Sequence, residues 1–198
     1  MLEEVWAEGI PSQWVVGDRL YGNSPGLRNA IHQQGRWYGL AMGAHHPVMP
    51  VEQGQEKPLN SLVEGLAESN WERLCFRMGE KGLIWYQWTV LRVMLSNDEG
   101  GEQWLVLQRT LDAEPEVTFY VSNAPAQTPL AELVAVALSR PPIEVLLEEA
   151  KGEVGMADYE VRHWHGWHRH MTLVMMAHTW LKLLQHDQRE KKAGCRPG

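Results

Sequence analysis

The sequence predicts an α/β protein that begins with a parallel strand–helix–strand unit, continues as an antiparallel β meander and ends in helices. Two short apolar runs, residues 14–16 and 37–41, flank a helical segment, which is the order of a βαβ unit. Aromatic and β-branched residues then dominate three segments between residues 83 and 122 that are joined by turn residues. Beyond Thr128, apolar residues recur with a helical period.

The first segments define the parallel unit. Residues 3–9 have the pattern of a helix end, and residues 14–16 are an apolar run typical of a buried parallel strand. Asp18 follows this strand at its carboxyl end, where open α/β sheets place their ligands. Ser24 precedes a proline and predicts a helix N-cap, and Gly35 is expected to end that helix before the second strand.

The middle of the chain changes character twice. Residues 43–58 are rich in Gly, Pro and polar side chains, which predicts a loop or linker. Ser61 and Glu64 fit a capping box and predict a short helix to about Glu68. The meander follows, with a turn at residues 97–101. Its expected strands are residues 83–95, 103–110 and 117–122.

Three helices are expected after the meander. The first covers residues 128–138, and Pro141 and Pro142 end it and begin the second. The last is long, from about residue 164 to 185. The second helix has an apolar stripe at helical spacing. Its members are Ile143, Leu146, Leu147 and Ala150.

The other face of the second helix is charged. Arg140, Glu144, Glu148 and Lys151 are three or four residues apart, so two cations bracket two carboxylates along one ridge. A carboxylate held between cations stays ionised, as a Mg²⁺ ligand must be. The alternative interpretation is a solvated amphipathic surface helix without a ligand.

The order Arg-x3-Glu-x6-Lys formed by Arg140, Glu144 and Lys151 resembles the signature around the last catalytic carboxylate of DDE transposases of bacterial insertion sequences. Other stretches are similar to the same family in the same order, and the first of them resembles the strand that carries its second catalytic Asp. These stretches are residues 14–22, 151–162 and 164–173.

The resemblance implies an RNase H-like α/β core interrupted by a β-rich insertion, of which this sequence corresponds to the C-terminal portion. The implied parts are a partial core over residues 1–45, the insertion over 46–125, and a return to the core with the Glu-bearing helix and the C-terminal helix over 126–198. The meander found by sequence pattern falls within the interval of the insertion.

The resemblance also implies Mg²⁺-dependent (or Mn²⁺-dependent) DNA strand cleavage and transfer, with Asp18 and Glu144 as metal ligands and Arg140 and Lys151 near phosphates of the transposon ends. Two metal ions in such a site activate the attacking oxygen and stabilise the leaving oxygen. The family's first Asp lies upstream of the second, and no Asp precedes Asp18 here. We therefore expect little or no catalysis from this chain alone.

Charge is distributed unevenly along the chain. The net charge of −7 argues against a strong sequence-independent grip on DNA by the whole chain. From Glu160 onward, however, there are seven Lys and Arg residues against three acidic ones. Arg162 and Arg169 in this segment are therefore candidate DNA-binding residues. A solvated helix end with a frayed basic tail is the alternative for residues 189–196.

Composition places the chain among cytoplasmic globular proteins. Its 198 residues suit one domain, or one domain with an inserted lobe, and two cysteines are too few for a disulfide framework. Neither a signal peptide nor a run of about 20 apolar residues is present. The expected partners are DNA at transposon ends and a second copy or an intact transposase, and no membrane.

Two other functions remain open from the sequence. The chain could be a non-catalytic remnant that binds DNA or an intact transposase. The histidines between His163 and His186 could also form a zinc site of an unrelated hydrolase, but they lack the i, i+4 pair expected on a helix, and no Cys lies nearby. A polar helix surface or a DNA-facing role is the favoured interpretation of these histidines.

Overall fold

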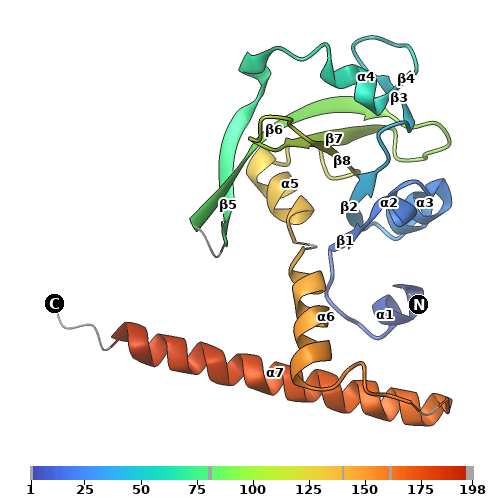
Figure 1. Ribbon diagram of the computed structural model, residues 1–198. Coiled ribbons are helices and arrows are strands. Elements are labelled where there is room, and N and C mark those ends of the chain that lie inside the picture. The colour runs from blue at the N-terminus through green and yellow to red at the C-terminus, as the bar shows by residue number, and fades with distance from the viewer. Residues whose placement is uncertain (1, 80–81, 140, 161, 195–198) are drawn as a thin grey trace. The chain divides into compact units, whose positions relative to one another are not determined.

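The computed structural model divides the chain into two units, Met1–Arg140 and Pro141–Gly198. The first unit contains helices and a mixed sheet, and the second contains two helices (Figure 1). The predicted α/β class is therefore confirmed. The expected boundaries at residues 45 and 125 both lie inside the first unit. The structure describes residues 2–79, 82–139, 141–160 and 162–194.

One sheet runs through the first unit in the order β1-β2-β8-β7-β6-β3-β4, and β5 pairs with β6 outside this path. Only β1 and β2 run parallel, and the other pairs are antiparallel. The strands are β1 (Trp14–Gly17), β2 (Trp37–Met42), β3 (Pro47–Pro50), β4 (Lys57–Pro58), β5 (Glu72–Gly79), β6 (Gly82–Met94), β7 (Glu102–Arg109) and β8 (Val117–Ser122).

The meander is continuous with the parallel unit. Strand β8 pairs with β2, with Leu40 opposite Val121, so β6, β7 and β8 extend the sheet that β1 and β2 begin. The sequence pattern predicted both parts but not this pairing, because hydrophobic alternation identifies a strand and not its partner. The β-rich segment is thus an extension of the sheet rather than a separate lobe.

Three expectations for the middle of the chain need correction. The predicted loop at residues 43–58 contains β3 and β4, and β3 pairs with β6. The predicted capping box is wrong, because the helix begins at Leu59 and the Ser61 hydroxyl donates to the Pro58 carbonyl. Strand β5 was not expected.

The helices of this unit are α1 (Leu2–Ala7), α2 (Arg19–Gly22), α3 (Pro25–Gln33), α4 (Leu59–Val63), the 3-10 helix η1 (Glu68–Asn70) and α5 (Leu130–Ala137).

Hydrophobic residues pack on both faces of the sheet. Leu105 and Leu107 belong to a cluster with Ile31 of α3 and Leu59 of α4. Val106, which lies between them, belongs to a second cluster that includes residues of α5. Neighbouring residues of a strand point to opposite faces, so α3 and α4 cover one face and α5 covers the other. Covering both faces allows the sheet to bury apolar residues on each of them.

The second unit consists of α6 (Pro141–Glu153) and α7 (Trp164–Gly194). Gly155 has a φ of 71°, a left-handed conformation that suits glycine, and follows the end of α6. Ala150 of α6 and Val174 of α7 are buried at 0% and 5% exposure. Both helices were predicted, although α7 extends to Gly194 rather than ending near residue 185.

Candidate functional site

Asp18 directly follows β1 and begins α2. Its side-chain Oδ1 accepts hydrogen bonds from the backbone N–H groups of Leu20 (2.9 Å) and Tyr21 (3.4 Å), so it is the N-cap of α2. The residue is half-buried at the carboxyl end of a parallel strand. A carboxylate has about four acceptor positions, and the cap therefore fixes its orientation without excluding a role as a metal ligand.

Glycine allows the turn that carries Asp18 to lie against β2. A Cβ atom on Gly22 would come within 1.8 Å of the carbonyl oxygen of Ala41. A guanidinium N–H of Arg28 in α3 also donates to the carbonyl of Gly22. Asp18 is thus placed by a strand, a capped turn and a buried side chain that holds the end of that turn.

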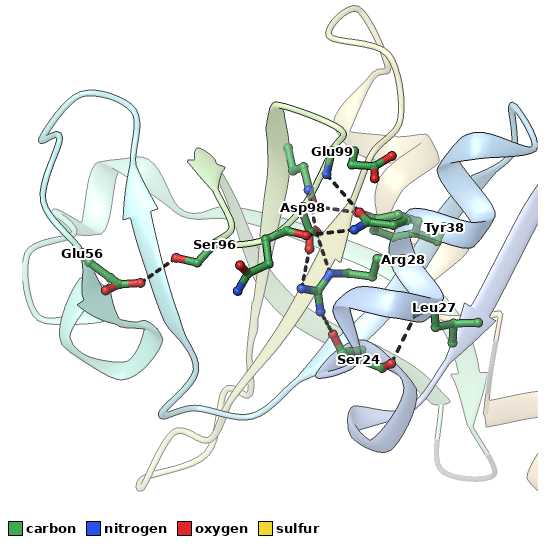
Figure 2. A network of polar contacts seen from close by, with 12 residues as sticks. Ser24, Leu27, Arg28, Tyr38, Glu56, Ser96, Asp98 and Glu99 are labelled. Carbon is green, nitrogen blue, oxygen red and sulfur yellow. Dashed lines mark hydrogen bonds and ion pairs between the residues drawn. The ribbon is translucent and has the colours of Figure 1, made fainter.

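Arg28 forms a buried ion pair with Asp98, which lies in the turn between β6 and β7 (Figure 2). Its Nε and Nη2 atoms donate to the two carboxylate oxygens at 2.7 Å each, and the two side chains are 0% and 1% exposed. The pair connects α3 to a turn seventy residues away. Opposite charges in a bidentate pair satisfy each other where water is excluded.

Two neighbours extend this network. The Gln103 amide donates to Asp98 at 2.8 Å, and the hydroxyl of Tyr38 donates to Gln103 at 2.7 Å. Burial, together with the negative charge of Asp98, raises the pKa of Tyr38 well above its usual range, so the phenol remains a donor. Asn29 adds two contacts to the same turn, through Asn97 and Glu99. The network joins α3, β2 and β7 to the turn between β6 and β7.

Strand β1 lies at one end of the sheet and pairs only with β2 among the described strands. Its four residues are half-buried and include no charge or proline, the features that usually protect an edge. A cavity of about 510 Å³ lies beside it, with an apolar lining from α1, β1, α3 and β2. Lining residues include Leu2, Trp6, Val15, Val16, Leu27 and Leu40.

Glu144 lies in the first turn of α6 and is exposed, and Lys151 is exposed in its last turn. Arg162 and Arg169 are exposed in the same unit. Arg140, the remaining predicted DNA-binding residue, is outside the residues that the structure describes. Asp18 belongs to the first unit, and Glu144 belongs to the second.

A different carboxylate of α6 is held between two basic groups. Glu149 contacts the Lys182 ammonium at 2.6 Å and His178 Nε2 at 3.3 Å, both on α7. Hydrogen bonding from Lys182, and then from His178, lowers the pKa of Glu149. The sequence predicted that Glu144 and Glu148 lie between cations, and it did not predict this role for Glu149. Residue spacing along one helix gives no information about which residues of a second helix will contact it.

Metal ligation depends on which carboxylates converge. Asp18 and Glu144 carry carboxylates, the class of hard oxygen ligand that Mg²⁺ or Mn²⁺ takes. Within the described parts of the chain, no group of three or more His, Cys, Asp and Glu side chains forms a metal-binding cluster.

The Arg28–Asp98 network was not predicted. Arg28 lies three residues before the buried Ile31 on α3, and that spacing alone signals an arginine facing the interior. No sequence feature identifies its partner.

Comparison with known proteins adds no assignment: no family model matches the chain, and no curated protein matches it. None of the described helices combines the length and apolar character needed to cross a membrane.

Proposed function

We propose that this chain is the C-terminal portion of a DDE transposase with a partial RNase H-like core. In this proposal it acts in the cytoplasm on DNA at the ends of an insertion sequence. It contributes Asp18 and Glu144 to a site for two Mg²⁺ (or Mn²⁺) ions. The ions would activate the attacking oxygen and stabilise the leaving oxygen of a phosphodiester.

The observation that carries the proposal is the position of Asp18. It follows the parallel strand β1 and caps α2, at the sheet edge where α/β proteins bind their ligands. Its cap, the close contact of Gly22 and the Arg28 hydrogen bond hold it on a rigid element. Catalytic carboxylates need such support, because small displacements of a ligand weaken a metal site.

The second unit supplies groups of the expected kind. Glu144 and Lys151 are exposed on α6, so both side chains can reach a metal or a phosphate. Together with Arg140, they have the spacing that resembles the transposase signature. Arg162 and Arg169 add exposed positive charge in the same unit.

The proposal includes little or no catalysis by this chain alone. The resemblance assigns the first Asp to a strand upstream of Asp18, and no Asp occurs among residues 1–17. The outer edge of β1 and its adjacent apolar cavity offer a place where another strand can extend the sheet. A strand added there would supply the missing carboxylate beside Asp18.

DNA cleavage by a reconstituted full-length protein tests this function. The chain is joined to the N-terminal segment of an intact insertion-sequence transposase, and Mg²⁺-dependent cutting of inverted-repeat DNA is measured. Asp18→Asn and Glu144→Gln should each reduce cutting to the metal-free level, whereas Glu148→Gln, one turn further along α6, should not. Asn caps helices as well as Asp does, so Asp18→Asn separates metal ligation from capping. Normal cutting by both variants would refute the proposal.

A second candidate function is a non-catalytic remnant that binds DNA or an intact transposase. The exposed Arg162 and Arg169 favour it, because they need no metal site to meet phosphates. A remnant would bind inverted-repeat DNA in a salt-dependent manner, or form dimers with itself or an intact transposase, yet would give no cleavage after reconstitution.

A further inference from the structure

Strand β1 directs backbone hydrogen-bonding groups away from the sheet. The C=O of Gln13 accepts from the N–H of Trp37 at 2.9 Å, and Trp14 lies opposite Trp37 in the parallel register. In a parallel pair, residues that bond to the neighbouring strand alternate with residues that point away from it. Gln13 and Val15 therefore face β2, whereas the N–H and C=O groups of Trp14 and Val16 point outward. Within the described part of the chain, no residue takes up these outward groups.

The other outer strands of the sheet are protected against pairing, and β1 is not. Strand β4, at the opposite end of the strand order, consists of Lys57 and Pro58, and lysine and proline both oppose the addition of a strand. Strand β5 carries Glu72 and Arg73 and has a register shift after Cys75, and charges and bulges have the same effect. The sequence of β1 contains no charge and begins with three residues that favour strands. The edge of β1 is therefore where this sheet accepts another strand.

The outward groups of β1 are complementary to those of a second copy of the same strand. When two copies run antiparallel about a two-fold axis through Val15, Trp14 of each copy lies opposite Val16 of the other. Residues opposite each other in a hydrogen-bonded antiparallel pair exchange both N–H···O=C bonds, so each outward group meets a partner. Such a contact closes on itself, and dimers with this symmetry are the commonest oligomers.

The side chains in and beside β1 are compatible with this pairing. In the same register, Asp18 lies opposite Ser12 of the second copy, so the carboxylates of the two copies do not face each other. Trp14 is half-buried and packs against the cluster beneath α5. Val16 of the second copy would lie beside it on this face. Aromatic and β-branched residues opposite each other stabilise antiparallel pairs.

We propose that the outer edge of β1 is a dimerisation edge, at which two copies of this chain pair antiparallel and join their sheets. This dimer needs neither DNA nor metal and is independent of the transposase function. The reconstituted transposase would have another strand at the same edge. One edge accepts one strand, so the added strand and the second copy exclude each other, and the second copy is the occupant for this chain alone.

Sedimentation velocity over a range of protein concentrations measures the association, and amide hydrogen exchange followed by NMR locates it. We expect a monomer–dimer equilibrium. The outward amides of Trp14 and Val16 should exchange at least about tenfold more slowly in the dimer than in the monomer. The amide of Val15, which faces β2, should be protected at both extremes of concentration and is the internal control.

A proline substitution tests the contact itself. Val16→Pro removes an outward N–H and leaves the bonds to β2 in place, and proline is tolerated on an edge strand at such a position. It should weaken dimerisation by about tenfold or more, because the symmetric contact loses the same bond twice. Val16→Ala keeps the N–H and should weaken dimerisation less. Far-UV circular dichroism and thermal melting check that each variant is folded.

Three results would overturn the proposal: a monomer at every concentration, a dimer whose Trp14 and Val16 amides exchange as fast as in the monomer, or a folded Val16→Pro variant that dimerises like the parent chain. Dimerisation that is lost in Trp180→Ser and retained in Val16→Pro would also overturn it, and would assign the contact to the exposed apolar side chains of α7. If Val16→Pro does not fold, amide exchange in the parent chain decides.

Discussion

The two units place their charged residues differently. In the first unit, Arg28 and Asp98 are buried together and hold α3 to the turn between β6 and β7. In the second unit, none of the described Lys, Arg, Asp and Glu side chains is buried. Large apolar side chains are exposed in both units, among them Leu20 in the first and Trp164 and Trp180 in the second. The first unit thus buries an ion pair, whereas the described charged side chains of the second unit all remain at least partly exposed.

This contrast separates the two predicted metal ligands. Asp18 is held by a cap, a close backbone contact and a buried arginine, so its position is set by the fold. Glu144 is exposed in the first turn of α6.

The largest expected effect comes from breaking the buried pair. Arg28→Met leaves the Asp98 carboxylate buried without its main partner, and should lower the free energy of unfolding by about 3–5 kcal/mol. Arg19→Met, an exposed arginine on α2, should change it by less than about 0.5 kcal/mol. Urea denaturation measures both. Equal losses of unfolding free energy in the two variants would contradict the stabilising role of the buried Arg28–Asp98 pair.

A somewhat smaller effect is expected at Gly22. A methyl group there meets the Ala41 carbonyl oxygen, which belongs to β2 and cannot rotate away. Gly22→Ala should therefore cost about 1–3 kcal/mol in unfolding free energy. Gly26→Ala is the control, since nothing lies within 4 Å of its Cβ position on α3; it should be neutral or stabilising by up to about 1 kcal/mol. Thermal melting that ranks them in the opposite order would contradict the tight packing of the Asp18 turn.

The smallest effect concerns the half-buried Glu149–Lys182 pair of the second unit. The folded-state pKa of Glu149 is lowered by Lys182, so the pair stabilises the unit above the unfolded carboxyl pKa of about 4.3. That contribution is lost as the pH falls through the lower folded value. In Lys182→Met, a carboxyl NMR titration should show the Glu149 pKa moving up, toward its ordinary value.

Lys151→Met provides the reference for that titration. Lys151 is on α6 two positions from Glu149, and residues two apart on a helix do not face each other. The Glu149 titration should be the same as in the parent chain. A rise in the pKa as large as that in Lys182→Met would show that general charge, rather than the α6–α7 contact, controls Glu149.

Local sequence signals predicted most of the elements. Ser24 and Gly35 marked α3 correctly, since Ser24 Oγ accepts from the Leu27 N–H and Gly35 has a φ of 64°. Strands β1, β2, β6, β7 and β8 followed from apolar runs and alternation. These signals act within a few residues, so the sequence contains them directly.

Contacts between residues far apart in the sequence were not predicted, and the reason is physical. The bond from Arg28 to Asp98 joins residues seventy positions apart, and a turn aspartate looks the same whether it faces water or a buried guanidinium. Strands β3 and β4 lie in a stretch rich in Gly and Pro, where pairing with β6 overrides the local preference for a loop. In the candidate site, the position of Asp18 at the carboxyl end of a parallel strand was predicted, but its role as a helix cap and the contact at Gly22 were not.

The central claim is that Asp18 and Glu144 bind the same metal centre, and metal-directed cleavage of the polypeptide tests it most directly. Fe²⁺, which accepts oxygen ligands, replaces Mg²⁺, and ascorbate with peroxide then generates radicals that cut the backbone near the metal. The account predicts cuts near residues 18 and 144 that Mg²⁺ suppresses, both lost in Asp18→Asn and both lost in Glu144→Gln. Cuts that disappear independently, or no cut at either position, would contradict it.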